Sequence, residues 1–245
     1  MRIMGKIQAA AQALLLSLLL ALPLSLNANS DSLLVLTTTN TVTLRGEITY
    51  KSVMQLQKDL ETAVTARGIK QYPIYLVLDS PGGSVDAGLN LIEYARTIPN
   101  LHTVTIFSAS MAAVTIELLP GKRYSVEAGQ VMFHKMKIFI APGFYSAPEL
   151  QEMATEMKKF EEQVELRIAK RLGVSVQEFQ QFIGLERWFR GREQTDFKIV
   201  DEIVQVKCTS ALTKERINAT VPTPFGDQKV QYSACPLIRA PVSFK

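Results

Sequence analysis

Apolar positions in the first half of the chain form two kinds of run, some continuous and some with helical spacing. Residues 74–78 are apolar without interruption, which is typical of a strand buried on both faces of a sheet. Apolar residues recur every three or four positions at 53–64 and again at 87–95, and this spacing predicts amphipathic helices. Short β-rich runs at 33–36 and 41–44 precede them. This order of strands and helices predicts βαβ units and a mostly parallel sheet.

The second half of the pattern contains two more strand-like runs and a long helix. The runs at 103–107 and 131–135 are predicted strands, and the first leads into a helix that stops before Pro120. A Ser-x-x-Glu capping box at Ser146 starts a helix whose narrow apolar stripe continues to Leu172. Such a stripe favours helix packing, either inside one subunit or between subunits.

The region after this helix has fewer signals. Ser175 begins a second capping box and a short helix. From Thr209 the chain is polar, contains proline and shows no clear periodicity, so the pattern predicts no helix or strand there.

The N-terminus has the order of a secretory signal. A basic hexapeptide precedes residues 9–26, which carry no charge and many leucines, and Ala28 offers a small residue for cleavage. We therefore predict a signal peptide at 1–28 and an exported protein, most simply in a bacterial periplasm. As a helix the run would span ~27 Å, close to the ~30 Å of a bilayer core. An uncleaved membrane anchor is the alternative. Contact with a membrane is expected only through this segment, and only if it is not cleaved.

Composition suits one globular domain with appendages. With 47% hydrophobic and 20% charged residues, 245 residues can bury one sizeable core. We expect an α/β domain at 33–207 and a tail at 208–245. The net charge is only +4, and no basic run with interleaved aromatic residues argues for nucleic-acid binding.

The only two cysteines are Cys208 and Cys235, both within the last forty residues. In an exported chain they would most simply pair with each other, and two unrelated free thiols are the alternative. No cluster of cysteines and histidines predicts a metal site, and we expect no cofactor.

Candidate chemistry centres on Ser110. It stands between the predicted strand at 103–107 and the helix that follows, where backbone N–H groups have no helical partner. These groups and the positive end of the helix suit a developing negative charge. The alternative is a serine that caps a core helix, which is common.

Two histidines compete for the role of general base. His102 begins the strand that leads to Ser110, so about eight extended residues at ~3.3 Å each place it at the opposite end of the sheet. His134 closes a different strand and can share the carboxyl edge with Ser110. A neutral imidazole there can accept the serine proton. A hydrogen-bonded histidine at a strand end is the alternative.

Gly82 and Gly83 directly follow the buried strand at 74–78. Glycine lets the backbone approach a substrate closely, so the amides of Gly83 and Met111 can form an oxyanion hole. Pro-Gly-Gly is also ordinary turn chemistry, and that alternative stays open. The segment does not match a phosphate-binding loop.

Together these segments resemble the proteolytic subunit of the Clp protease, in the ClpP/crotonase superfamily. The resemblance extends from about Val42 to Val206 and rests on four motifs in the family's order: Asp79-Ser-Pro-Gly-Gly-Ser-Val85, Ala109-Ser-Met-Ala-Ala113, Pro120-Gly-Lys-Arg-Tyr124 and Val131-Met-Phe-His134.

The resemblance implies a serine endopeptidase with a ClpP/crotonase-like ββα-repeat fold. Ser110 would be the nucleophile and His134 the base. The resemblance also implies a handle-type helix after Ser146 that joins subunits into homo-oligomeric rings. Substrate contacts would come from four residues: Gly82, Ser84, Lys135 and Met136.

The third catalytic residue in the family is an aspartate, and the matching position here holds Glu186. A glutamate can orient an imidazole from a slightly more distant backbone. Glu193, Asp196 and Asp201 are rivals for the role.

Three departures from the family shape the expected function. The segment after His134, starting at Lys135, replaces a glycine-containing segment on which substrate strands pair. An exported protein would also have no ATP supply, so no ATP-driven unfoldase is expected, and the tail with its two cysteines is foreign to the pattern. We therefore expect a peptidase acting on peptides or unfolded proteins.

Three alternatives remain open at this point. The first is a crotonase-type enzyme that stabilises a thioester enolate, and the second is a membrane-protein peptidase with a serine and a lysine base. The third is a catalytically inactive scaffold that binds peptides at the membrane.

Overall fold

The computed structural model describes residues 32–244, except 68–71, 138 and 225. The predicted signal at 1–28 lies outside these residues. None of the helices within the described residues is long and apolar enough to cross a membrane.

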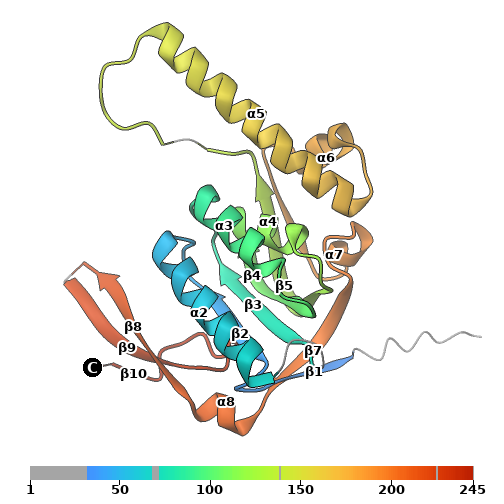
Figure 1. The fold of residues 1–245 in the computed structure, drawn as a ribbon, viewed down its shortest axis with the longest axis vertical. Helices are drawn as coiled ribbons and strands as arrows, with labels where there is room; N and C mark the ends of the chain where they lie inside the picture. Colours follow the sequence, from blue (N-terminus) through green and yellow to red (C-terminus); the bar gives the residue numbers. More distant parts are fainter. Residues whose placement is uncertain (1–31, 68–71, 138, 225, 245) are drawn as a thin grey trace, which may run out of the picture. The chain divides into compact units, whose positions relative to one another are not determined.

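The main sheet has seven strands. Six of them follow the spatial order β1-β7-β5-β4-β3-β2, and each neighbouring pair is parallel, while β6 runs antiparallel to β5. The predicted mostly parallel α/β sheet is confirmed (Figure 1). The strands are β1 (Leu33–Leu36), β2 (Thr41–Arg45), β3 (Ile74–Ser80), β4 (Leu101–Ala109), β5 (Arg123–His134), β6 (Glu186–Arg190) and β7 (Glu202–Cys208).

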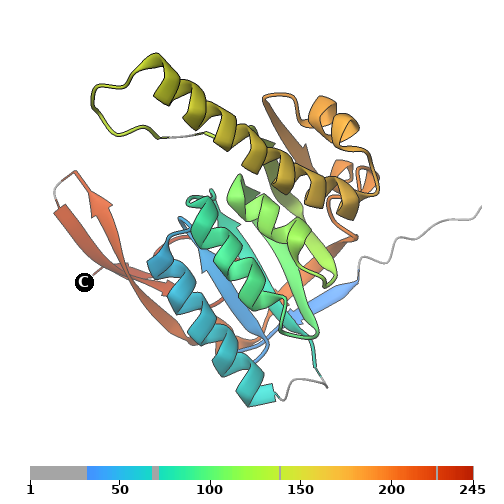
Figure 2. The ribbon, with the colours of Figure 1, turned by 45° about the horizontal axis from the view of Figure 1, so that its top comes forward.

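Helices cover one face of this sheet, and together they enclose the larger apolar core. α2, α3 and α4 lie side by side on that face, and the C-terminal half of α5 packs next to α4 (Figures 1 and 2). The helices are α2 (Tyr50–Arg67), α3 (Val85–Ala95), α4 (Met111–Leu118), α5 (Ala147–Leu172), α6 (Val176–Ile183), α7 (Glu193–Asp196) and α8 (Ser210–Lys214). Both predicted capping boxes are present, at Ser146 with Glu149 and at Ser175 with Glu178.

Helix α5 is divided into two halves with different surroundings. Its C-terminal half buries Val164, Ile168 and Leu172 in the core, whereas Leu150 near its start is exposed. Figures 1 and 2 show the N-terminal half extending beyond the other helices. The apolar stripe read from the sequence therefore serves packing inside the subunit in one half only.

The tail contains regular structure that the sequence pattern did not reveal. β8 (Arg216–Thr223), β9 (Gly226–Ser233) and β10 (Ser243–Phe244) form a separate three-stranded antiparallel sheet. Most of β8 and β9 is exposed, so neither strand has the alternation of apolar residues that a half-buried strand shows. Strand β5 likewise begins at Arg123, eight residues before the predicted start, because polar and charged residues occupy its first half.

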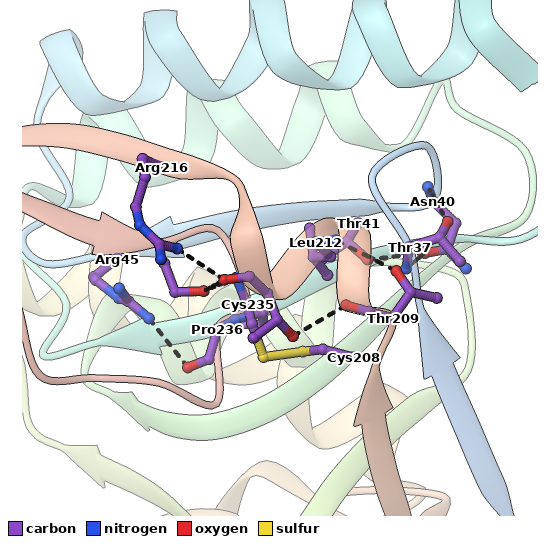
Figure 3. The surroundings of a disulfide bond; sticks show 12 residues. Thr37, Asn40, Thr41, Arg45, Cys208, Thr209, Leu212, Arg216, Cys235 and Pro236 are labelled. Carbon is purple, nitrogen blue, oxygen red and sulfur yellow. Dashed lines mark hydrogen bonds between the residues drawn. A yellow bond between two sulfur atoms is a disulfide. The ribbon is translucent and has the colours of Figure 1, made fainter. Parts of the chain in front are cut away.

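A disulfide joins this tail to the main sheet. Cys208 at the end of β7 is bonded to Cys235 just after β9, as the sequence predicted (Figure 3). Cys235 packs in a second, smaller core on the other face of the sheet with Val77, Val104 and Leu212. The tail is thus part of the folded domain rather than an appendage.

A buried ionic cluster lies where β5 begins. Arg123 contacts Glu117 (Nη1 to Oε2, 2.6 Å) and Asp201 (Nη2 to Oδ1, 2.7 Å). Burial raises the pKa of Glu117 to about 8, against the opposing pull of Arg123. Burial alone would raise the pKa of Asp201 as well, but hydrogen bonds from Arg123 outweigh it and lower that pKa. The cluster joins α4, β5 and the segment before β7.

Replacing Asp201 with asparagine should destabilise the protein. Because Arg123 is buried, losing one carboxylate should cost about 2 kcal/mol at pH 7, less than for a fully buried pair because the Asp201 side chain is 37% exposed. The lowered pKa of Asp201 means that wild type keeps this contribution above about pH 4 and loses it as the pH falls further. Denaturant unfolding at pH 7 and pH 3 measures both effects. Asp196→Asn, which alters an exposed carboxylate on α7, is the control, and an equal loss there would contradict the assignment.

Candidate active site

Ser110 occupies the junction of β4 and α4 in a strained backbone conformation. Its φ of 52° and ψ of −121° lie in a region that costs a non-glycine residue about 1–3 kcal/mol. A hydrogen bond from its amide to the carbonyl of Met132 on β5 (2.9 Å) helps to hold it there. The junction forms because an apolar strand ends directly before a run of helix-forming residues.

The Ser110 hydroxyl does not cap the helix that it precedes. The side chains of Ser84, Ser146 and Ser175 each accept a hydrogen bond from the first turn of their helix. Ser110 occupies the same position before α4 but makes no such bond. This excludes the helix-capping alternative, and the hydroxyl is left to the cavity that it lines.

Gly82 and Gly83 bring the β3–α3 loop against this junction. A Cβ at Gly82 would lie 2.7 Å from both the Ser110 Cβ and the Ala109 carbonyl, and φ is positive at both glycines. Gly83 is bridged to Ile48, where the Ile48 amide binds the Gly82 carbonyl and the Ser84 amide binds the Ile48 carbonyl, both at 2.8 Å. A larger residue does not fit at either position.

The amides proposed for an oxyanion hole lie at the same cavity. Both bonds of the bridge to Ile48 use neighbours of Gly83, so the N–H of Gly83 itself points to the other side of the loop. Met111 is the first residue of α4, and its N–H therefore has no acceptor within the helix. Gly83 and Met111 both line the cavity beside Ser110.

His134 reaches this cavity from the end of β5. Its Nδ1 lies against the carbonyl oxygen of Lys135. A protonated Nδ1 would donate to that carbonyl and leave Nε2 as the acceptor, the tautomer that a general base needs. Within the part of the chain that the structure describes, no hydrogen bond joins Ser110 to His134. The structure therefore places them at one cavity without a formed contact.

His102 lies at the far end of the sheet, as predicted. It is near the start of β4, where its Nδ1 accepts a hydrogen bond from the Lys122 amide (2.9 Å). Burial lowers the pKa of His102, and Lys122 adds to the effect. This side chain has a structural role in the folded domain.

Glu186 lies directly opposite His134 in the antiparallel β5–β6 pair. The bond from the Lys135 amide to the Leu185 carbonyl makes this a non-hydrogen-bonded pair, in which facing side chains are closest. The Glu186 carboxylate nevertheless accepts a hydrogen bond from the Trp188 indole (2.9 Å) and is exposed. Strand β6, which the sequence analysis did not predict, is what brings Glu186 to His134.

The rival carboxylates are engaged elsewhere or placed elsewhere. Glu193 pairs with Arg187 at 2.9 Å. Asp201 pairs with Arg123, which lies eleven residues before His134, at the opposite end of β5. Asp196 is exposed on α7. Among these residues, only Glu186 stands in register with His134.

The cavity itself has a volume of about 300 Å³ and mostly apolar walls. Its apolar lining combines α3, α4, β5, α5 and α6: Val85, Val114, Phe133, Val164, Ile168, Phe179 and Ile183. Met136 also lines it, whereas Gly82 and Ser84 do not, and the Ser84 hydroxyl caps α3.

Two carboxylates of α5 that sequence reasoning missed form the polar rim. Glu165 pairs with Lys135 and accepts a hydrogen bond from Gln180 (2.6 Å). Glu161 accepts one from the Met136 amide (2.6 Å). The segment after His134 is thus bound to α5. The available signal was an acidic pair four residues apart beside the apolar stripe.

In the described residues, no group of three or more His, Cys, Asp or Glu side chains is arranged to hold a metal ion.

Comparison with known proteins identifies the family. The model of the Clp protease family matches residues 26–207, well over half of the chain. The chain belongs to the Clp protease family. It is thus a ClpP-like peptidase in general terms, and the resemblance read from its motifs is confirmed.

Individual relatives cover different shares of the sequence. ATP-dependent Clp protease proteolytic subunit 3 of Rhodococcus jostii is 29% identical over 67% of this chain and 80% of its own length. Subunit 1 of Frankia casuarinae is 29% identical over 54% of this chain and 62% of its own. Subunit 3 of Streptomyces coelicolor is 30% identical over 54% and 61%. The family match ends at residue 207, directly before the disulfide-linked tail.

The strain at Ser110 leads to a prediction about stability. Glycine adopts positive φ at little cost, so Ser110→Gly should be about 1 kcal/mol more stable than Ser110→Ala. Thermal unfolding of both variants measures the difference. Thr62→Gly and Thr62→Ala, at an exposed position inside α2, form the control pair and should show the opposite order, with the glycine variant about 1 kcal/mol less stable. A Ser110→Gly protein less stable than Ser110→Ala would contradict the assignment of strain.

Proposed function

We propose that this protein is an exported serine endopeptidase that hydrolyses peptides or unfolded proteins through an acyl-enzyme on Ser110. The observation that carries the proposal is the Ser110 hydroxyl, which does not cap α4 and is held on a strained turn in the same cavity as His134. Family membership supports peptidase chemistry in general.

In the proposed reaction, the Ser110 oxygen attacks the peptide carbonyl while Nε2 of His134 takes its proton. The N–H groups of Gly83 and Met111 stabilise the negative charge that develops on the carbonyl oxygen. His134 then returns the proton to the leaving amine, and water cleaves the acyl-enzyme. The apolar cavity favours an apolar substrate side chain beside the scissile bond.

Glu186 is the proposed third member of this site. Its backbone lies opposite His134, so a change of rotamer away from Trp188 is the movement required to reach the imidazole. Catalytic hydrogen bonds often tighten only when substrate binds. Until then the Lys135 carbonyl can hold His134 in the required tautomer.

Export is supported by two independent features. The first is the basic segment followed by the apolar run at the N-terminus. The second is the Cys208–Cys235 disulfide, since such bonds persist in oxidising compartments. The relatives named above are called ATP-dependent. An exported protein has no ATP supply, so we propose that this one acts without an ATP-driven unfoldase.

Labelling with a fluorophosphonate probe tests the proposed chemistry directly. Wild type should be labelled and Ser110→Ala should not. His134→Ala should react about 10²–10⁴-fold more slowly, the usual contribution of general base catalysis. Glu186→Ala should react more slowly than Glu193→Ala, the control. A folded wild type that remains unlabelled would overturn the peptidase and favour a peptide-binding scaffold, and full labelling of His134→Ala would point to a lysine base.

The exposed half of α5 supports a homo-oligomer, proposed here as a ring. Leu150 is exposed and Met153, Met157 and Phe160 are half-buried, so an apolar stripe lies open along the helix. Covering it against other subunits would remove this surface from water.

Light scattering on purified protein tests the ring. Leu150→Glu with Met157→Glu should reduce the oligomer to smaller species, because charges would enter the apolar stripe. Thr155→Glu, on the exposed polar side of the same helix, should leave the mass unchanged. A wild-type monomer, or a double variant that keeps the wild-type mass, would contradict this assembly.

A further inference from the structure

Asp79 is a buried carboxylate at the end of β3, and two arginines contact it. Its side chain is only 5% exposed. Arg239 of the tail approaches it in a fork, with Nη2 2.8 Å from Oδ1 and Nε 3.2 Å from Oδ2. Arg45 of β2 is more distant, with Nε 3.4 Å from Oδ2. The closer of the two ion pairs therefore comes from outside the region that matches the Clp protease family.

The tail segment that carries Arg239 is held at several points. Cys235 is tied to Cys208, and the Ile238 amide bonds to the Cys235 carbonyl (3.1 Å). Ile238 packs against the smaller core. Arg45 also donates to the Pro236 carbonyl (3.0 Å), as Figure 3 shows, so it links the tail and Asp79. These contacts anchor the backbone from which Arg239 reaches Asp79.

Asp79 stands four residues before Gly83, near the carboxyl end of β3. The Ser80 hydroxyl that follows accepts a hydrogen bond from the Gly82 amide (3.1 Å). The pairing of β3 with β4 shifts register between Leu78 and Asp79, so regular strand pairing is interrupted at this point. A displacement of Asp79 would therefore move the β3–α3 loop and change the position of the Gly83 amide.

We propose that Arg239 is a positioning residue for the proposed oxyanion loop. By pairing with Asp79 it fixes the end of β3 and, through it, the Gly83 amide beside Ser110. Without Arg239, the ion pair that the buried carboxylate keeps among the described residues is the longer contact to Arg45, and the carboxylate is drawn toward water because a buried charge needs a close partner. The inference rests on the proposed function, since it assigns the loop a role in catalysis.

Hydrolysis of a fluorogenic peptide with an apolar residue before the scissile bond is the kinetic test. Arg239→Ala should lower kcat about tenfold with KM unchanged, since a misplaced donor affects the transition state more than substrate binding. Arg239→Lys should recover part of the loss, because lysine restores the charge without the two-pronged geometry. Arg216→Ala removes another exposed tail arginine, which binds nearby carbonyls, and should behave as wild type. Equal kcat for Arg239→Ala and Arg216→Ala would overturn the inference.

Hydrogen exchange provides a readout that does not depend on activity. The amides of Ile48 and Ser84 form the bridge that fixes the loop, so they should lose protection in Arg239→Ala and keep it in Arg216→Ala. Unchanged protection at both amides in Arg239→Ala would overturn the inference. If wild type neither labels nor hydrolyses peptide, the proposed function fails, while this exchange result still decides whether Arg239 holds the loop.

Discussion

The close approach of the β3–α3 loop to Ser110 is the constraint on which the site depends. No Cβ fits at Gly82, because the space where it would lie is already taken by Ala109 and Ser110. That contact requires β3 and β4 to be neighbours and parallel, so that their carboxyl ends meet at one edge. It also requires Ser110 to keep a costly conformation, which the bond from its amide to Met132 supports. The sheet is therefore the support that keeps Ser110 and the glycine amides together.

Around this fixed centre, the remaining parts of the site are held by contacts of a different kind. His134 and Glu186 meet through strand pairing, but their side chains are bonded to Lys135 and Trp188 respectively. The segment after His134 is attached to α5 through Glu161 and Glu165. The Gly83 and Met111 amides are thus held in place by the backbone, whereas the side chains of His134 and Glu186 can be rearranged by rotation. The two halves of helix α5 differ in the same way: its C-terminal half lines the cavity, and its N-terminal half is exposed.

The sequence predicted the parts of the site that depend on local pattern. The strand before Ser110, the glycines after β3 and the strand end at His134 all follow from runs of apolar residues and the breaks between them. The pairing of His134 with Glu186 required β6, a short strand with only one fully buried residue, which has no distinct pattern. The tail strands were missed for the same reason, since exposed antiparallel strands need no apolar alternation. The contact of Arg239 with Asp79 spans 160 residues, and no local pattern reports such a pairing.

The disulfide also determines what a cut in the tail would do. The β8–β9 hairpin lies entirely between Cys208 and Cys235. A protease that cleaved this hairpin would produce two chains still joined by one covalent bond, with Arg239 on the shorter piece. The nicked molecule would keep its full mass until it was reduced. A hairpin exposed to other peptidases, or to neighbouring copies of this one, can therefore be cleaved without releasing the segment that contacts Asp79.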